Sequence, residues 1–172
     1  MPGEINDFSG DTRGLTQTFR DAMASLAATA CVVTAARDGM RLGRTVTAAF
    51  SLAVEPPSIL VSIREESALA AMIRRAGGFS FAMLTVPQQP VAEAFAGQLP
   101  PEERFRRGDW TAWPSGHPRL HGAVATMDCA VGGEIPVAGH VLFVGEVRVL
   151  EFDRARAPLI WHDRGFRTVR RL

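Results

Sequence analysis

The stretch from Leu42 to Ile63 reads LGRTVTAAFSLAVEPPSILVSI and gives the strongest indication of how the chain folds. Read at the period of a β-strand, Thr45–Val54 separates into two faces. One face carries apolar side chains that suit a core: Val46, Ala48, Phe50, Leu52 and Val54. The other carries small side chains, three of them hydroxyls: Thr45, Thr47, Ala49, Ser51 and Ala53. The small face lets a flat ligand approach the backbone, although an ordinary solvated strand face has the same composition.

The residues on either side of this strand predict its neighbours. Pro56-Pro57 predicts a break, because proline has no N–H to donate to a ladder. Ile59–Ile63 is a continuous apolar run, typical of a strand that is buried on both faces. Asp38-Gly39 predicts a hairpin turn between a strand over Cys31–Ala35 and the Thr45 strand.

Three helices are predicted from apolar periodicity and from end signals. They cover Thr16–Ala27, Ala68–Arg75 and Gln88–Ala96. Ser67 is a suitable N-cap for the second helix, and Gly77-Gly78 ends it.

The second half of the chain adds long strands over Ala123–Val131 and His140–Glu151, and a closing hairpin from Pro158 to Val169. The total is six or seven strands with two or three short helices. The spacing of the turns favours an antiparallel barrel over a parallel βαβ sheet. Between these parts, Leu99–Arg119 carries four prolines and is predicted to be a long irregular loop.

Composition limits the function classes. With 172 residues the chain fits one domain over residues 15–172, preceded by a flexible tail over residues 1–14. A net charge of +1 argues against a nucleic-acid partner. No apolar run approaches the roughly 20 residues that cross a bilayer. No signal-peptide layout is present, and Cys31 and Cys129 lie in apolar runs that suit free buried thiols, so we expect a cytoplasmic protein.

Metal and nucleophile chemistry find little support in the sequence. His117 and His121 are four residues apart, but Pro118 between them argues against a shared helix face. Neither cysteine has a zinc-like spacing to a histidine, so no metal site is expected. No Gly-x-Ser-x-Gly elbow, Walker loop or Gly-x-Gly-x-x-Gly motif occurs.

A phosphate site is the better hypothesis, at the junction of the Ile59–Ile63 strand and the helix that follows. Arg64 and Ser67 stand beside the helix N-terminus, where free N–H groups and the helix dipole favour an anion. The alternative is an ordinary capped helix with a surface arginine. Glu65 and Glu66 oppose the phosphate hypothesis unless they face away.

An ordered set of motifs extends from about Phe19 to Val169 and resembles the flavin reductase family, whose fold is an FMN-binding split β-barrel. The motifs are Gly43-x-Thr45, Ser51, Pro56-Pro57, Gly78-Phe79, Gln88, Phe95-Ala96, Arg104-Phe105, Pro118-x-Leu120, Cys129, Gly139-His140, Gly145-Glu146-Val147 and Pro158-Leu159. The resemblance therefore implies a mainly β, antiparallel split barrel with short helices.

The resemblance also implies site residues. Contacts to the flavin ring and ribityl chain fall on Thr45, Thr47, Ala48, Ala49 and Ser51, and contacts to its phosphate on Ser62, Arg64 and Ser67. His140 matches a histidine placed near the nicotinamide, but Ala138 stands where an Asp is common. Phe166 stands where many relatives have Tyr, so it can stack but not donate a hydrogen bond.

The function that the resemblance implies is an NAD(P)H:flavin oxidoreductase with FMN, or alternatively FAD, as its flavin. Such proteins are typically homodimers, and many supply reduced flavin to a separate monooxygenase. In this interpretation the Leu99–Arg119 loop gates the second substrate. Three alternatives remain open. One is a cob(II)yrinic acid a,c-diamide reductase of cobalamin synthesis, because Phe19–Met23 and Leu142–Val147 are similar to that branch. The others are a flavin-binding protein without turnover, and a barrel whose hydroxyl-rich strand is merely exposed.

Overall fold

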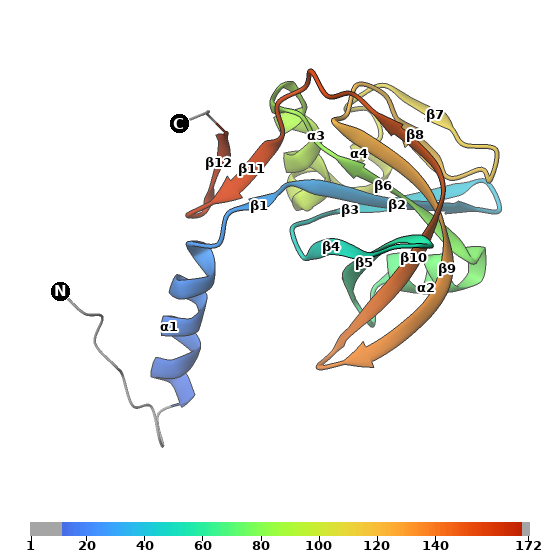
Figure 1. Cartoon of the computed structure of the whole chain (residues 1–172). Helices are drawn as coiled ribbons and strands as arrows, with labels where there is room; N and C mark the ends of the chain where they lie inside the picture. Colours follow the sequence, from blue (N-terminus) through green and yellow to red (C-terminus); the bar gives the residue numbers. More distant parts are fainter. Residues whose placement is uncertain (1–11, 170–172) are drawn as a thin grey trace.

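Antiparallel sheets make up most of the computed structural model, which describes residues 12–169 (Figure 1). The largest sheet has the strand order β3-β2-β6-β9-β10-β5-β4, and smaller sheets have the orders β1-β11-β12 and β7-β8. The strands are β1 (Ala28–Thr29), β2 (Cys31–Arg37), β3 (Met40–Val46), β4 (Ala49–Val54), β5 (Pro57–Arg64), β6 (Gly78–Met83), β7 (Trp110–Ala112), β8 (Pro118–Leu120), β9 (Ala125–Val137), β10 (His140–Phe152), β11 (Leu159–His162) and β12 (Gly165–Thr168). The helices are α1 (Thr12–Ala24), α2 (Ala68–Ala76), α3 (Gln89–Glu93) and α4 (Pro101–Arg104), with a 3-10 turn η1 (Val86–Gln88) and a π-helical turn η2 (Ala94–Gln98). The predicted mainly β, antiparallel fold is confirmed, with more short strands than the six or seven expected.

The two edges of the largest sheet meet, and this makes the sheet a barrel with an open seam. β3 and β4 stand at opposite ends of the strand order, yet only Thr47 and Ala48 separate them. A connection of this length spans at most about 11 Å, so the sheet must curl until its edges are close. Next to the seam, the β4–β5 pairing continues to Ala48, whose carbonyl accepts from the N–H of Ser62 (3.0 Å).

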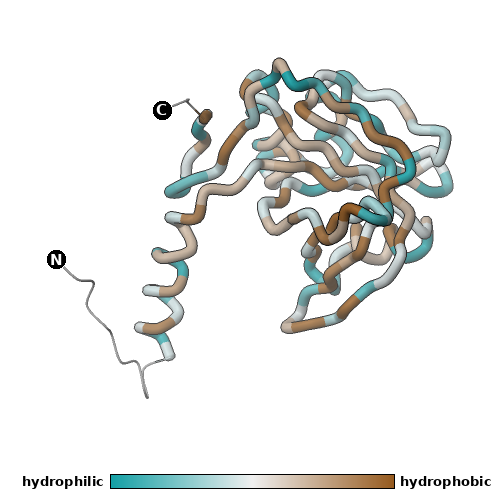
Figure 2. The backbone as a smooth tube through the Cα atoms, viewed as in Figure 1, coloured by the Kyte–Doolittle hydropathy of each residue, from teal (hydrophilic) through white to brown (hydrophobic). Residues whose placement is uncertain are grey.

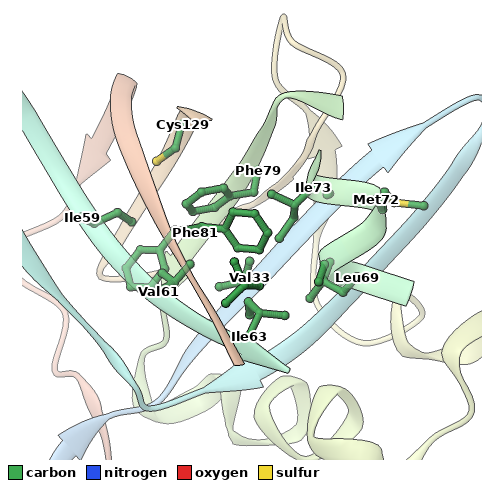
Figure 3. Close-up of a cluster of buried hydrophobic side chains, with 14 of the residues drawn as sticks. Val33, Ile59, Val61, Ile63, Leu69, Met72, Ile73, Phe79, Phe81 and Cys129 are labelled. Carbon is green, nitrogen blue, oxygen red and sulfur yellow. The ribbon is translucent and has the colours of Figure 1, made fainter. Parts of the chain in front are cut away.

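Two cores hold the barrel, because β2 is buried on both faces. Val33 packs with Phe79 and with Ile73 of α2 in the first core (Figure 3). Val32, one residue away and on the other face, packs with Phe95 in the second core. Each such large apolar side chain contributes about 1.5–3 kcal/mol when it is fully buried.

The Thr45–Val54 prediction is wrong in two respects. The segment is not one strand, because β3 ends at Val46 and β4 begins at Ala49. The β4 part of the face predicted to be in the core is exposed: Phe50 is 58% exposed, Leu52 45% and Val54 86%. Val46 on β3 does pack against the first core. β4 is an edge strand with a register shift between Ser51 and Ala53, and among the described residues its only sheet neighbour is β5. β5 itself fits the prediction, with Ile59, Leu60, Val61 and Ile63 buried.

The N-terminal helix lies earlier than predicted and packs less than predicted. α1 begins at Thr12, inside the expected tail, and ends at Ala24; residues 1–11 of that tail lie outside the described residues. Its apolar residues Leu15, Phe19 and Met23 recur at helical spacing but are all exposed. Figure 2 shows how hydrophobic and hydrophilic positions alternate along this helix.

α1 extends away from the barrel and meets the β11–β12 hairpin at its C-terminal end (Figure 1). The N–H of Asp163 donates to the carbonyl of Ala24 (2.7 Å), and Arg164 forms an ion pair with Asp21. The helix is therefore attached at one end, with its apolar face uncovered by the described part of its own chain.

The Leu99–Arg119 segment is more ordered than the predicted loop, because its aromatic residues enter the second core. The ring of Phe95 lies 5.0 Å from that of Phe105 and 5.5 Å from that of Trp110, measured between centroids. Trp113 is buried, and its Nε1 donates to Ser80 Oγ (3.0 Å). Within residues 12–169, no helix is long and apolar enough to cross a membrane.

Candidate functional site

Three clefts meet at the seam of the barrel, and Thr47 lines all of them. The seam cleft, of about 370 Å³, is lined by Arg44, Thr45, Val46, Thr47, Ala48, Ser62, Ile63, Arg64, Ser67 and His140. The aromatic cleft, of about 250 Å³, is lined by Ala30, Arg44, Thr45, Val46, Thr47, Ala96, Trp161 and Phe166. The apolar cleft, of about 450 Å³, is lined by Leu26, Ala27, Ala28, Thr29, Cys31, Thr47, Ala49, Phe50, Ser51, Ile59, Phe81, Met83 and Met127.

Most of the site residues predicted from the sequence come together in the seam cleft. These are Thr45, Thr47, Ala48, Ser62, Arg64, Ser67 and His140. Ala49 and Ser51 instead line the apolar cleft, and Phe166 lines the aromatic cleft.

Some residues that line these clefts were missed by the sequence reasoning. Arg44 lines two clefts, and Trp161 packs against Phe166 on the wall of the aromatic cleft. A signal for Arg44 was present, since it is the only charged residue between Leu42 and Val54. The sequence carried no such signal for Trp161, because only the pairing of β11 with β12 brings it next to Phe166.

The register of β5 and β10 explains why three distant polar residues share one cleft. His140 lies directly opposite Arg64, and Leu142 lies opposite Ser62. Side chains of opposed residues in an antiparallel pair project from the same face of the sheet. Ile63 alternates to the other face and is buried in the first core.

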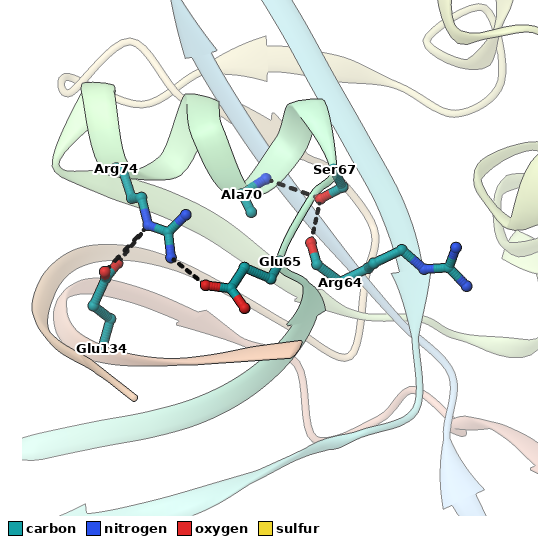
Figure 4. A network of polar contacts seen from close by, with 6 residues as sticks. All are labelled: Arg64, Glu65, Ser67, Ala70, Arg74 and Glu134. Atoms are coloured by element: carbon teal, nitrogen blue, oxygen red, sulfur yellow. Dashed lines mark hydrogen bonds and ion pairs between the residues drawn. The ribbon is translucent and has the colours of Figure 1, made fainter. Parts of the chain in front are cut away.

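The start of α2 is built as the sequence predicted. Ser67 has extended backbone, and its Oγ accepts from the N–H of Ala70 (3.1 Å) while donating to the carbonyl of Arg64 (2.7 Å; Figure 4). The hydroxyl proton of Ser67 is therefore bonded to the Arg64 carbonyl and is not available to a ligand. Any donor from this turn to a ligand comes from the unpaired N–H groups that open every helix.

The acidic residues beside Arg64 do not neutralise it. The carboxylate of Glu65 turns to Arg74 (Nη2–Oε1 3.8 Å), which also binds Glu134 (Nε–Oε2 2.9 Å), whereas the Arg64 guanidinium extends to the other side (Figure 4). Glu66 is exposed and has no ion pair with any described residue. Arg64 likewise has no carboxylate partner within residues 12–169, so its charge remains available to an anion.

The predicted hydroxyl donors are not equivalent. Thr45 Oγ1 donates to the carbonyl of Ala92 (2.6 Å), so it can only accept from a ligand. The hydroxyls of Thr47, Ser51 and Ser62 have no partner among the described residues and keep their protons for a ligand. Two donors at the seam cleft are therefore Thr47 and Ser62.

His140 is held by its own turn. Its Nδ1 lies 3.3 Å from the carbonyl of Ala138, and the carbonyl of Gly139 accepts from the N–H of Glu65 (3.0 Å). A protonated Nδ1 donates to Ala138 and leaves Nε2 facing outward as an acceptor. The backbone of Ala138 thus supplies the acceptor that an Asp side chain would offer.

Other reactive groups lie away from the clefts or are inert. Cys31 and Cys129 are free and buried, and burial raises the pKa of each thiol to about 12. Among the described residues no group of three His, Cys, Asp or Glu side chains is arranged to hold a metal ion. No residue of Leu99–Arg119 lines any of the three clefts within the described chain, which gives the gating hypothesis no support.

The donor set fits a flat, singly phosphorylated ligand. The seam cleft combines the unpaired guanidinium groups of Arg44 and Arg64, a helix start and small side chains, and no Asp or Glu lines it. Such a set matches the phosphate, ribityl chain and ring of FMN.

Comparison with known proteins agrees with this chemistry. The family model "Flavin reductase like domain" matches residues 23–170. The reductase component of an FADH(2)-dependent resorcinol hydroxylase from Rhizobium sp. strain MTP-10005 is 34% identical over 152 residues, which are 87% of this chain and 85% of that protein. The FMN reductase (NADH) RutF of Ancylobacter novellus is 33% identical over 153 residues, 89% of this chain and 84% of its own.

A solved structure shows the same fold. BorF, the flavin reductase component of a bacterial two-component tryptophan halogenase, superposes with a TM-score of 0.82 at 28% identity, over 90% of this chain and 98% of its own. The fold and the relatives define a flavin oxidoreductase, as the sequence predicted. The chain belongs to the flavin reductase-like family.

Proposed function

We propose that this protein is an NAD(P)H-dependent flavin reductase that binds FMN in the seam cleft. The observation that carries the proposal is the convergence of Arg64, Ser62, His140 and the start of α2 on the small side chains at Thr47–Ala48. When bound, FMN accepts a hydride at N5 and passes electrons to an acceptor, so the protein needs no base or nucleophile of its own.

Each part of the cleft has a role in positioning. Arg64 and the N–H groups of the α2 start hold the phosphate. Ala48 leaves room for the ring to approach the backbone at the seam, and Thr47 donates to its polar edge. His140 orients the nicotinamide so that the two rings come into contact, which is a geometric contribution to the rate. Phe166, packed edge-on against Trp161 (centroids 4.9 Å apart), offers a face for stacking from the neighbouring aromatic cleft.

The protein acts as a homodimer in this proposal. β4 exposes the apolar residues Phe50, Leu52 and Val54 along its length (the β4 row), and α1 exposes a second set of apolar residues. Exposed apolar surface of this extent is typical of protein–protein interfaces. A second copy that covers both regions gives an obligate interface of roughly 2,000 Å² or more.

The electron acceptor is a flavin that serves a partner monooxygenase. Relatives named as reductase components of a resorcinol hydroxylase and of 4-hydroxyphenylacetate 3-monooxygenase support this assignment. The relatives named FMN reductase (NADH) favour a flavin over a corrin acceptor, with NADH as donor.

Titration of flavin-free protein with FMN, FAD and riboflavin tests the proposal. We expect saturable binding of FMN, weaker binding of riboflavin, and oxidation of NADH that depends on added flavin. Absence of heat and of saturation with both FMN and FAD contradicts the proposal. Binding without NADH oxidation supports a flavin-binding protein that lacks turnover.

A further inference from the structure

Arg44 stands on the wall between two clefts, and its position is fixed by the packing beside it. Residues 44–47 line both the seam cleft and the aromatic cleft. The preceding residue, Gly43, is buried so tightly that an added Cβ would lie 2.6 Å from the Phe95 ring. The backbone of β3 cannot shift at this point, and strand alternation directs the exposed Arg44 side chain away from that core.

The charge of Arg44 is not compensated. The guanidinium of Arg44 has no hydrogen bond or ion pair with any residue of the described chain, and neither cleft that Arg44 lines includes an Asp or Glu. Many arginines elsewhere are paired, as Arg74, Arg119 and Arg156 are.

A second cation stands nearby. Arg104 donates to the carbonyls of Leu99 (3.1 Å) and Gly43 (3.2 Å) rather than to a carboxylate. Burial, and then the charge of Arg44, lower the pKa of Arg104, and Glu102 acts in the opposite direction. Arg104 lines neither cleft, but its positive charge adds to that of Arg44, and the resulting positive potential favours an anion at Arg44.

This anion is distinct from the phosphate assigned to Arg64. Arg64 lies at the end of β5 next to α2 and does not line the aromatic cleft, whereas Arg44 lies on β3 and lines both clefts. Trp161 and Phe166 line the aromatic cleft together with Arg44, and because their rings pack edge-to-face at an interplanar angle of 71°, each can offer a face to a flat base. FMN has one phosphate and one ring system, so it does not account for both a second unpaired arginine and a second aromatic cleft.

From this arrangement we infer that Arg44 recognises the diphosphate of a dinucleotide whose base enters the aromatic cleft. The inference rests on the proposed flavin site in the seam cleft. FAD and NADH share the required chemistry, since each carries an adenosine diphosphate group. Guanidinium groups bind such oxygens in a bidentate manner that an ammonium group does not reproduce.

The test compares Arg44→Ala and Arg44→Lys with wild type, and uses Arg154→Ala as the matched control. Arg154 is an exposed arginine that lines none of the three clefts. ADP, FMN and FAD affinities are measured by calorimetry, and KM and kcat for NADH at saturating FMN. We expect Arg44→Ala to weaken ADP about 10-fold, the size of one charge-assisted hydrogen bond at an exposed site, and FMN less than about 2-fold. Arg44→Lys should be intermediate, and the difference should shrink at high salt.

The same experiment distinguishes FAD from NADH as the source of the diphosphate. A parallel loss of FAD affinity assigns the subsite to the flavin dinucleotide, and a raised KM for NADH with unchanged kcat assigns it to the nicotinamide dinucleotide. The inference is overturned if Arg44→Ala leaves the affinities for ADP and FAD and the KM for NADH unchanged. It is also overturned if the variant loses affinity for FMN and for ADP to the same extent. Wild-type protein that binds ADP through Arg44 but no flavin contradicts the proposed function and leaves the Arg44 assignment standing.

Discussion

β4 and β5 are neighbours both in the chain and in the sheet, yet their apolar residues have opposite fates. β5 buries Ile59, Val61 and Ile63 in the first core and directs Ser62 and Arg64 into the seam cleft. β4 leaves Phe50 and Leu52 exposed. The periodicity of a strand thus defines its two faces, but what covers each face depends on the rest of the assembly. We attribute the burial on β5 to the barrel itself, and the apolar row on β4 to a second copy of the chain.

The largest effect is expected in the β5 core. Ile59→Ala should lower the free energy of unfolding by about 2–5 kcal/mol, because the removed atoms leave a cavity. Urea denaturation measures this loss. The control is Met40→Ala on β3, an exposed apolar residue for which a change within about 0.5 kcal/mol is expected. Equal losses in the two variants would remove the contrast between core and surface.

A substitution in the β4 row should weaken self-association rather than the stability of the fold. Phe50→Asp buries a charge in the proposed interface and should weaken self-association by about 2 kcal/mol or more, as at an interface hot spot. Light scattering should give twice the chain mass of 18.6 kDa for wild type and a shift toward the monomer for the variant. Met40→Asp is the matched control and should leave the mass unchanged. A wild-type monomer at micromolar concentration contradicts the homodimer.

A substitution at the end of β5 that faces the seam cleft should change ligand affinity and leave folding unaffected. Arg64→Ala should weaken FMN by about 1.5–3 kcal/mol, the range for a hydrogen bond to a charged group. Riboflavin, which lacks the phosphate, should bind both proteins almost equally. If calorimetry shows that both ligands weaken to the same extent, Arg64 supports the structure and the anchor lies elsewhere.

His140 lies opposite Arg64 on β10, so its role has to be separated from that of the phosphate anchor. His140→Ala should raise the KM for NADH and lower kcat/KM about 10- to 100-fold, a loss of roughly 1.4–2.7 kcal/mol, because hydride transfer needs the rings aligned. Stopped-flow reduction at several NADH concentrations measures this effect. FMN affinity should change little. If FMN affinity falls while the reduction rates are unchanged, His140 binds the FMN phosphate instead of orienting the nicotinamide.

The smallest effect concerns His117, which lies away from both strands and should report on folding only. Its Nδ1 accepts from the N–H of Ala36 (3.3 Å), and burial lowers its pKa below the usual 6.5, opposed by Asp128. Below about pH 6.5 the unfolded chain therefore binds the proton more readily than the native chain, and stability falls as the pH falls. Thermal unfolding against pH should show a shallower slope in His117→Gln. FMN affinity should be the same in both proteins.

Local signals explain which parts of the structure the sequence predicts. Ser67 as N-cap and Gly77 as C-cap depend only on nearby residues, and both were predictable. The burial of Ile59–Ile63 was equally predictable, because a continuous apolar run is typical of a strand that is buried on both faces.

Non-local features explain the errors. The break at Thr47–Ala48 arises because the sheet closes on itself, and no local pattern encodes this closure. Phe50 is exposed because β4 is an edge strand, and no local pattern distinguishes an edge strand from a central one. Arg44 was overlooked because a charged residue in a strand is usually just a surface residue, and only the meeting of two clefts distinguishes it.

Anaerobic reduction of the FMN-loaded protein tests the central claim most directly. NADH or NADPH is mixed with the complex, and the visible flavin absorbance is followed over time. If the seam cleft holds a flavin that accepts hydride, the band bleaches with a rate that saturates in nucleotide concentration, and air restores it. A complex that keeps its colour at saturating NADH and NADPH contradicts the assignment of this protein as a flavin reductase.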